Sequence, residues 1–242
     1  MLPGYRRRIL ITPAPGIVSA ELEDDYHRMV VTLEHDNDVV TKVVSEMKRS
    51  PWTLCPGAIS KLAETFTGVG LAVFGSRGNK KQNCTHLFDL ALFAAAHANE
   101  AASVAYDIFV SDPLEGARTA TLSRNSKPVL DWKLRGEVFL APADLAGQRL
   151  GELNDWIAGQ HKVGAEAGRI LRWAAIIAFG RSMDIPAGIP ATSFPGGACY
   201  NFQPERAATS TRRTGADVDF SQPGAAPLAD LTKWFEGSSG AA

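Results

Sequence analysis

Two cysteines stand where a helix is expected to begin. Residues 84–89 read CTHLFD and bring a thiol, an imidazole and a carboxylate close together at the start of an apolar run. Cys55 precedes Pro56, and proline is favoured at the first position of a helix. The positive end of the helix macrodipole stabilises a thiolate, so the placement of Cys55 and Cys84 predicts reactive thiols at a functional site. The alternative is that both are buried, unreactive side chains, as free cysteines commonly are.

Two histidines have a carboxylate on the expected same side of their element. His86 and Asp89 are three residues apart in a predicted helix over residues 85–99, and His27 lies two residues after Asp25 near a strand. Either pair predicts an imidazole base that is oriented by a carboxylate, with Tyr106 or an arginine holding the developing oxyanion. The alternatives are a polar turn at residues 23–27 and a structural Asp89 that stabilises the helix N-terminus.

A metal centre is the second chemical hypothesis. Cys55, Cys84 and His86, with His27 as a further ligand, are of the kinds that zinc or iron binds. Their spacing matches no standard metal motif. The acid–base hypothesis that rests on the histidines requires no metal or other cofactor. The sequence has no glycine-rich phosphate loop, no Gly-x-Ser-x-Gly elbow and no His-Glu-x-x-His motif.

Composition indicates a globular protein with no global attraction for polyanions. The 242 residues are 45% apolar and 21% charged, and the net charge is −1, so we expect neither nucleic acid nor membrane as a partner. The longest apolar run, residues 173–179, is far below the ~20 residues that span a bilayer. The N-terminal apolar run is too short for a signal peptide, and three cysteines form no disulfide framework. These features predict a cytoplasmic protein.

Alternating apolar residues predict two antiparallel β-meanders, over residues 8–47 and 104–140. Helices are predicted at residues 56–67, 85–99, 145–159 and 163–183. The last of these is apolar almost all round, so it should be a central buried helix or a homodimer interface. The predicted fold is a single α+β domain over residues 1–220 with an extended C-terminal arm, and a partly disordered tail over residues 221–242. The two meanders could also be an internal duplication, although antiparallel strands resemble one another in any case.

Several motifs carry a resemblance to a known family. They are YRR at 5–7, EDDYH at 23–27, PWTLCPGA at 51–58, CTHLFDLA at 84–91, YD at 106–107 and CYNFQPER at 199–206. With them the chain resembles the bacterial domain-of-unknown-function family 2889 from about residue 5 to about residue 220. The family has no general activity, and the resemblance implies a setting in the bacterial breakdown of aromatic and acyl compounds.

The first function hypothesis is a cofactor-independent lyase for a small, hydroxymethyl-bearing phenolic compound. Proton abstraction from a hydroxyl would lead to carbon–carbon cleavage and release of a small aldehyde such as formaldehyde. The alternatives are a metal-dependent hydrolase or metal-binding protein and a non-catalytic assembly partner. Six side chains are expected to bind the small-molecule substrate: Cys55, Cys84, Trp52, Arg118, Tyr200 and Arg206.

Overall fold

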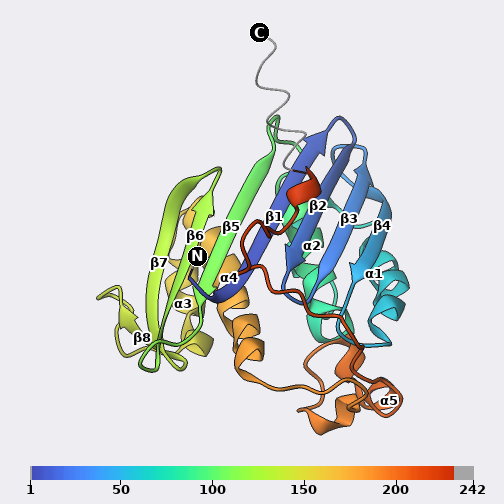
Figure 1. Cartoon of the computed structure of the whole chain (residues 1–242). Coiled ribbons are helices and arrows are strands. Elements are labelled where there is room, and N and C mark those ends of the chain that lie inside the picture. Colours follow the sequence, from blue (N-terminus) through green and yellow to red (C-terminus); the bar gives the residue numbers. More distant parts are fainter. Residues whose placement is uncertain (1, 232–242) are drawn as a thin grey trace. The chain divides into compact units, whose positions relative to one another are not determined.

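Eight strands form one antiparallel sheet in the computed structural model of the chain, which describes residues 2–231 (Figure 1). The strand order is β4-β3-β2-β1-β5-β6-β7-β8, so each half of the sheet is a meander. The strands are β1 (Gly4–Ala14), β2 (Ile17–Asp24), β3 (Arg28–His35), β4 (Val40–Arg49), β5 (Val104–Ser111), β6 (Ala117–Arg124), β7 (Lys127–Arg135) and β8 (Val138–Ala141). The α+β class and the two predicted meanders are confirmed.

Two strands of the first meander, β2 and β3, show regular alternation of buried and partly buried residues. Met29, Val31 and Leu33 of β3 are fully buried, while the residues between them are only partly buried. Met29 pairs with Leu22 of β2, and the register keeps one apolar face along both strands. A slip of one residue would turn every one of these side chains to the other face, so the register is strongly specified.

The turn of the second meander is specified by its own residues. Asn125 and Ser126 connect β6 to β7 and have φ angles of 49° and 62°. Two consecutive positive φ angles match the twist of a two-residue hairpin, and asparagine tolerates this conformation better than most residues. The hairpin then aligns Ala120 with Trp132, both of which are buried.

Helices pack on each half of the sheet (Figure 1). In the first half, α2 contacts β2 and β3 and α1 contacts β4, whereas α4 contacts β6 and β7 in the second half. The helices are α1 (Ala58–Phe66), α2 (Thr85–Ala96), α3 (Asn154–Ala158), α4 (Lys162–Ile177) and α5 (Pro204–Ala207). Short 3-10 helices include η1 (Cys55–Gly57), η2 (Leu71–Ser76), η3 (Lys80–Gln82), η5 (Ala178–Ser182) and η7 (Tyr200–Phe202).

The helices after residue 144 differ from the sequence prediction. The predicted helix over residues 145–159 is only a 3-10 turn at Leu150–Glu152 followed by the five-residue α3. The prediction that α4 is a central helix buried within the chain is wrong, and the alternative of a homodimer interface stays a prediction. Ile170 and Leu171 are fully buried, but Ile176 is 47% exposed and Val163 is 37% exposed, so α4 is amphipathic.

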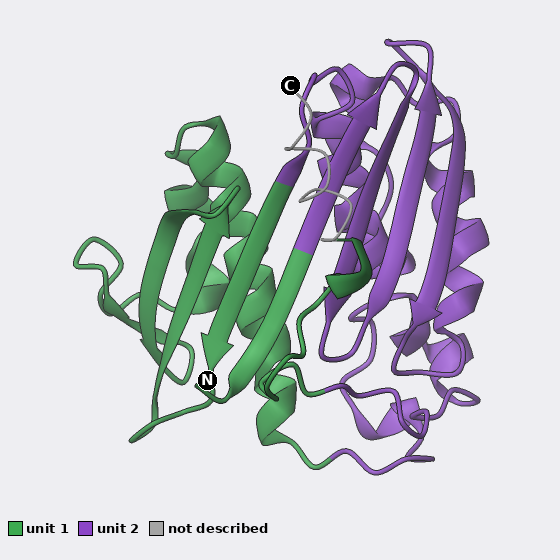
Figure 2. Ribbon diagram, turned by 45° about the horizontal axis from the view of Figure 1, so that its top comes forward, with its two compact units in different colours: residues 1–8, 105–184, 219–242 green, residues 9–104, 185–218 purple. Residues whose placement is uncertain are grey.

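The chain divides into two compact units (Figure 2). One unit consists of residues 1–8, 105–184 and 219–242, and the other of residues 9–104 and 185–218. The first part of β1 therefore belongs to one unit and the rest of β1 to the other. The single domain predicted over residues 1–220 stays a prediction, and residues 232–242 of the predicted tail lie outside the described residues.

The predicted C-terminal arm follows α4 and η5. Between residues 185 and 218 it contains only short helices and two isolated bridges, Pro190 to Thr211 and Trp52 to Arg212. Thr53 donates its N–H to the Thr211 carbonyl at 3.0 Å, and the arm therefore lies along the segment that leads into η1.

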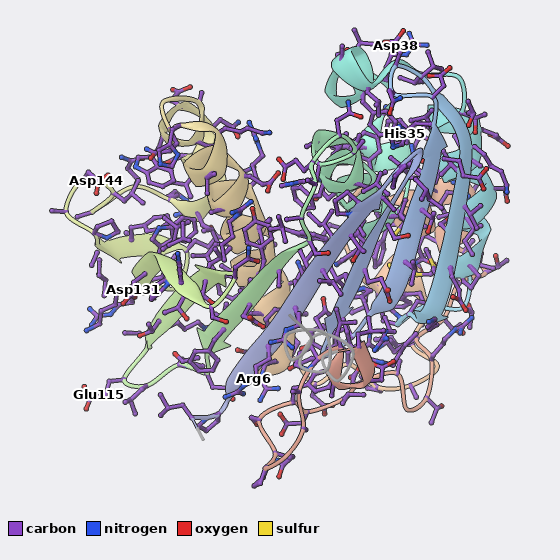
Figure 3. The ribbon with its side chains drawn as sticks, turned by 90° about the horizontal axis from the view of Figure 1, so that it is seen from above. Arg6, His35, Asp38, Glu115, Asp131 and Asp144 are labelled. Atoms are coloured by element: carbon purple, nitrogen blue, oxygen red, sulfur yellow. The ribbon has the colours of Figure 1, made fainter. Side chains whose placement is uncertain are left out.

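Both outer strands are hydrogen-bonded to the chain's own loops. At the start of β4, the Val40 N–H donates to Val69 at 3.0 Å and the Gly68 N–H donates back to Val40 at 2.7 Å. At the other edge, Phe139 of β8 exchanges hydrogen bonds with the loop at residues 147–148. Figure 3 shows His35 and Asp38 together where β3 ends and the chain turns toward β4. Within the part of the chain that the structure describes, no helix is long and apolar enough to cross a membrane.

Candidate active site

A tight turn between β2 and β3 creates an aspartate–histidine pair. Asp24 is fully buried, and its Oδ1 accepts hydrogen bonds from the backbone N–H groups of Tyr26 and His27, both at 2.8 Å. The same oxygen bonds the Nδ1 of His27 at 3.0 Å. One carboxylate oxygen therefore shapes the turn and fixes the imidazole that the turn carries.

This hydrogen bond defines which nitrogen of His27 is free to react. An ionised carboxylate only accepts hydrogen bonds, so the Nδ1 of His27 carries the proton that is shared with Asp24. The Nε2 of the neutral ring then presents its lone pair, which is the arrangement of an oriented general base.

His86 stacks on His27. The ring centroids are 3.8 Å apart with an interplanar angle of 28°, and each residue is only 6% exposed. His86 is the second residue of α2, and α2 packs on β2 and β3, so the helix brings the second ring to the turn between these strands.

Arg49, the last residue of β4, holds the turn in place. Its guanidinium donates to the backbone carbonyl of Asp24 at 2.6 Å, of Asp25 at 2.8 Å and of His27 at 3.3 Å. It also donates to the carbonyl of Ala216 in the arm at 3.1 Å. Arg49 thus fixes the backbone on both sides of His27 and joins it to the arm.

The same three side chains are a possible metal-ligand set. Ligand atoms of Asp24, His27 and His86 all lie within 4.8 Å of one another, and two histidines with one carboxylate are a common set for iron. A metal lies in the plane of each imidazole that binds it. The two ring planes here are nearly parallel and converge far beyond the ~2 Å of a metal–nitrogen bond. The stacked arrangement therefore fits an acid–base pair better than a metal centre.

The two cysteines predicted to be reactive differ chemically from the expectation. Cys84 is the N-cap residue of α2 and Cys55 is the first residue of η1, as predicted, but both are buried. Burial, followed by the charge of Cys199, raises the pKa of the Cys55 thiol to about 12. Burial and then the charges of Cys55 and Cys199 raise the pKa of Cys84. The predicted thiolates are wrong: desolvation outweighs the macrodipole at both positions.

The two carboxylates expected to orient the histidines have other surroundings. Asp25 lies in the turn rather than in a strand, so strand alternation does not place it beside His27, and the bonded carboxylate is Asp24. Asp89 lies on α2 as predicted, where both of its oxygens accept hydrogen bonds from the Lys80 ammonium at 2.6 Å.

Two predicted site residues belong to the other unit. Tyr106 is fully buried in β5, donates to the Glu166 carboxylate of α4 and accepts from Arg124 at 3.2 Å. Burial and then Glu166 raise the pKa of Tyr106. Arg118 donates to Ser182 at 2.7 Å in the same unit. The structure thus gives both residues a partner within their own unit.

The remaining predicted binding residues surround the arm. Trp52 is buried in a small apolar cluster with Cys55, Ala191 and Ala207. Tyr200 donates its backbone N–H to Asn83 at 2.9 Å, and the Arg206 guanidinium stacks on the Tyr200 ring at 3.9 Å. These contacts tie the arm to η1 and to the segment that enters α2.

Sequence reasoning missed Asp24 and Arg49. Asp24 had a usable signal, because aspartate at the first position of a turn commonly accepts N–H groups two and three residues later. Arg49 had none, because its four carbonyl partners come from residues 24–27 and 216 and are remote in sequence.

The chain was also compared with known proteins. No protein-family model matches it, and no curated protein matches it. The resemblance to family 2889 stays a prediction.

Proposed function

We propose that the protein is an acid–base enzyme whose general base is His27, oriented by Asp24. The hydrogen bond between the Nδ1 of His27 and the buried Asp24 carries this proposal. A histidine held by a carboxylate can take a proton near neutral pH, and the ionised pair that forms is stabilised by the carboxylate.

The reaction that we propose is a carbon–carbon lyase reaction on a small phenolic compound with a hydroxymethyl group. His27 takes the hydroxyl proton, the oxygen electrons form the carbonyl of formaldehyde, and the carbon–carbon bond breaks. A carbonyl or quinone-methide group of the substrate that is conjugated to the cleaved carbon accepts its electron pair and becomes an enolate or phenoxide, until the same histidine returns the proton to carbon. This sequence needs no oxidant, reductant or cofactor. The setting in bacterial aromatic catabolism, the cytoplasmic location and a homodimer are parts of the proposal that rest on sequence alone.

The competing function is metal binding. It is favoured by the proximity of Asp24, His27 and His86, rather than by the Cys55, Cys84 and His86 set predicted from sequence. Binding of a metal ion would require the ring of His27 or His86 to rotate out of the stacked arrangement. Metal analysis of the untagged protein distinguishes the two functions.

The test is turnover of hydroxymethyl-bearing phenolics by the His27→Gln variant, with formaldehyde release as the measurement. Glutamine keeps a hydrogen-bonding side chain but cannot titrate, so we expect a loss of ~10²–10⁴-fold in rate. The melting temperature should stay close to that of the parent. His161→Gln is the matched control, because His161 belongs to the other unit and accepts an N–H at the start of α4.

Turnover by His27→Gln within a few-fold of the parent would refute the assignment of the base. Turnover that disappears on chelation and returns with a divalent metal would replace the lyase mechanism by a metal-dependent one.

A further inference from the structure

A polar pocket lies between α1 and the loop that precedes α2. Its volume is about 340 Å³, near the lower end of the roughly 300–1,000 Å³ that is typical of small-molecule sites. Its lining residues are Lys61, Thr65, Arg77, Gly78, Asn79, Gln82 and Asn83. Two of these side chains are cationic, three are amides and none is a carboxylate. None of them belongs to the Asp24–His27–His86 group.

Hydrogen bonds among Thr65, Asn79 and Asn83 hold the wall of the pocket. They do not involve the charged groups of Lys61 and Arg77. The Thr65 hydroxyl lies 2.7 Å from the Lys61 carbonyl and 3.2 Å from the Asn83 side-chain oxygen, and Asn83 donates to the Asn79 carbonyl at 3.0 Å. Asn83 is 1% exposed, so it forms a fixed floor. Because α1 and the loop are joined in this way, the pocket is a preformed feature.

Gly78 allows the loop to approach α1 this closely. Its φ is 77°, and a Cβ atom at this position would lie 2.4 Å from the Cγ2 atom of Thr65. Thr65 cannot turn away without losing the hydrogen bonds of its hydroxyl. A glycine is therefore required both by the backbone conformation and by the contact.

The free donors of the pocket are suited to an oxyanion. Within residues 2–231, no hydrogen bond or ion pair occupies the guanidinium of Arg77 or the amide nitrogen of Asn79. The Lys61 ammonium is paired at 3.2 Å only with Glu64, which is largely exposed. The neighbouring cation Lys80 is neutralised by Asp89. A guanidinium offers a planar fork of N–H donors that matches a carboxylate or a phosphate.

We propose that this pocket binds the carboxylate or phosphate group of a small molecule, with Arg77 as the bidentate donor and Lys61 as the second charge. The amide of Asn79 supplies a neutral donor to the same group. This binding is independent of the acid–base reaction proposed above.

Calorimetric titration of the full chain with inorganic phosphate and, separately, with benzoate at low ionic strength tests the proposal. We expect saturable binding of at least one anion, weakened at least tenfold by Arg77→Gln and weakened by added salt. Arg135→Gln is the matched control, because Arg135 is an exposed arginine in β7. The affinity of this variant for the anion should equal that of the parent. The anion that binds more tightly identifies the group that the pocket accepts.

Binding by neither anion, or equal affinity of Arg77→Gln and the parent, overturns the proposal. If Arg77→Gln fails to fold, Lys61→Gln carries the same test, since Lys61 lies on the solvent-exposed side of α1. The His27→Gln variant should bind the anion as the parent does, which separates a failure of this proposal from a failure of the acid–base proposal.

Discussion

The single carboxylate of Asp24 holds both the backbone of the turn and the His27 ring. Three of its hydrogen bonds converge on a single oxygen, two from the backbone of the turn and one from the His27 ring. Removal of the carboxylate would therefore disturb the turn and the base at once. His27 is the better position for a functional test, because its ring is the proposed base and does not hold the backbone of the turn.

The buried thiols give a residue-scale prediction. Neither Cys55 nor Cys84 should react with a thiol reagent at pH 7.5 in the folded protein, because burial raises both pKa values and keeps the thiols neutral. Both should react quickly after denaturation. Fast labelling of either residue in the folded chain would show that the thiol is accessible as a thiolate.

The raised pKa of Cys55 also makes stability depend on alkaline pH. The neutral thiol is favoured in the folded state, so this stabilisation is complete below the unfolded pKa near 9 and decreases as pH rises toward about 12. Urea unfolding of the parent should show a loss of stability in this range that is smaller in Cys55→Ala. Equal pH slopes for the two proteins would contradict the assignment.

At the scale of elements, α4 gives a paired prediction. Ile170→Asp places a carboxylate at a fully buried position and should lower the free energy of unfolding by several kcal/mol or prevent folding. Ile176→Asp changes a residue that is 47% exposed and should stay within about 0.5 kcal/mol of the parent. Thermal denaturation of both variants is the measurement. A strong effect at residue 176 would mean that another surface covers this face of α4.

The same helix shows what sequence could predict about the elements. The strands of both meanders could be predicted because apolar residues at every second position, such as Met29, Val31 and Leu33, indicate a strand with one buried face. The exposed side of α4 was not, because Ile176 and Ile170 have the same side chain and only packing distinguishes them. The prediction of reactive thiols is wrong for a similar reason. Cys84 lies at the start of the helix as predicted, but its thiol is buried and not exposed.

For the candidate site, sequence pointed to His27 and His86 but not to their contact. The stacking of the two rings depends on how α2 packs on β2 and β3, and no local pattern records that packing. Strand alternation favours Asp25, two residues before His27, as the orienting carboxylate. In a turn, the preceding residue Asp24 is the one that reaches the imidazole.

At the scale of the whole molecule, Arg49 connects segments that are far apart in the chain. Arg49→Met keeps much of the apolar stem but removes the donors to Asp24, Asp25 and Ala216, and their buried carbonyls would lose a partner. We expect a loss of ~1–3 kcal/mol in the free energy of unfolding. Hydrogen exchange should rise at the β2–β3 turn and at residues 216–218.

Lys48→Met is the control for Arg49→Met, because Lys48 is the preceding residue of β4 and forms an ion pair with Glu46 at 3.7 Å. It should leave stability and exchange unchanged. If Arg49→Met also exchanges like the parent, the arm is held to the turn by other contacts, such as the hydrogen bond from Val218 to Asp25 at 2.8 Å.

The loops that cover both outer strands bear on how copies of the chain could associate. An uncovered edge strand is a template for another strand, and proteins that leave one exposed tend to extend their sheets from molecule to molecule. Here residues 68–70 occupy the start of β4, residues 147–148 occupy β8, and the exposed Lys42 of β4 carries a charge paired with Glu34. Addition of a strand from another copy is therefore disfavoured at the start of β4 and at Phe139 of β8, where the chain's own loops already use the backbone hydrogen bonds.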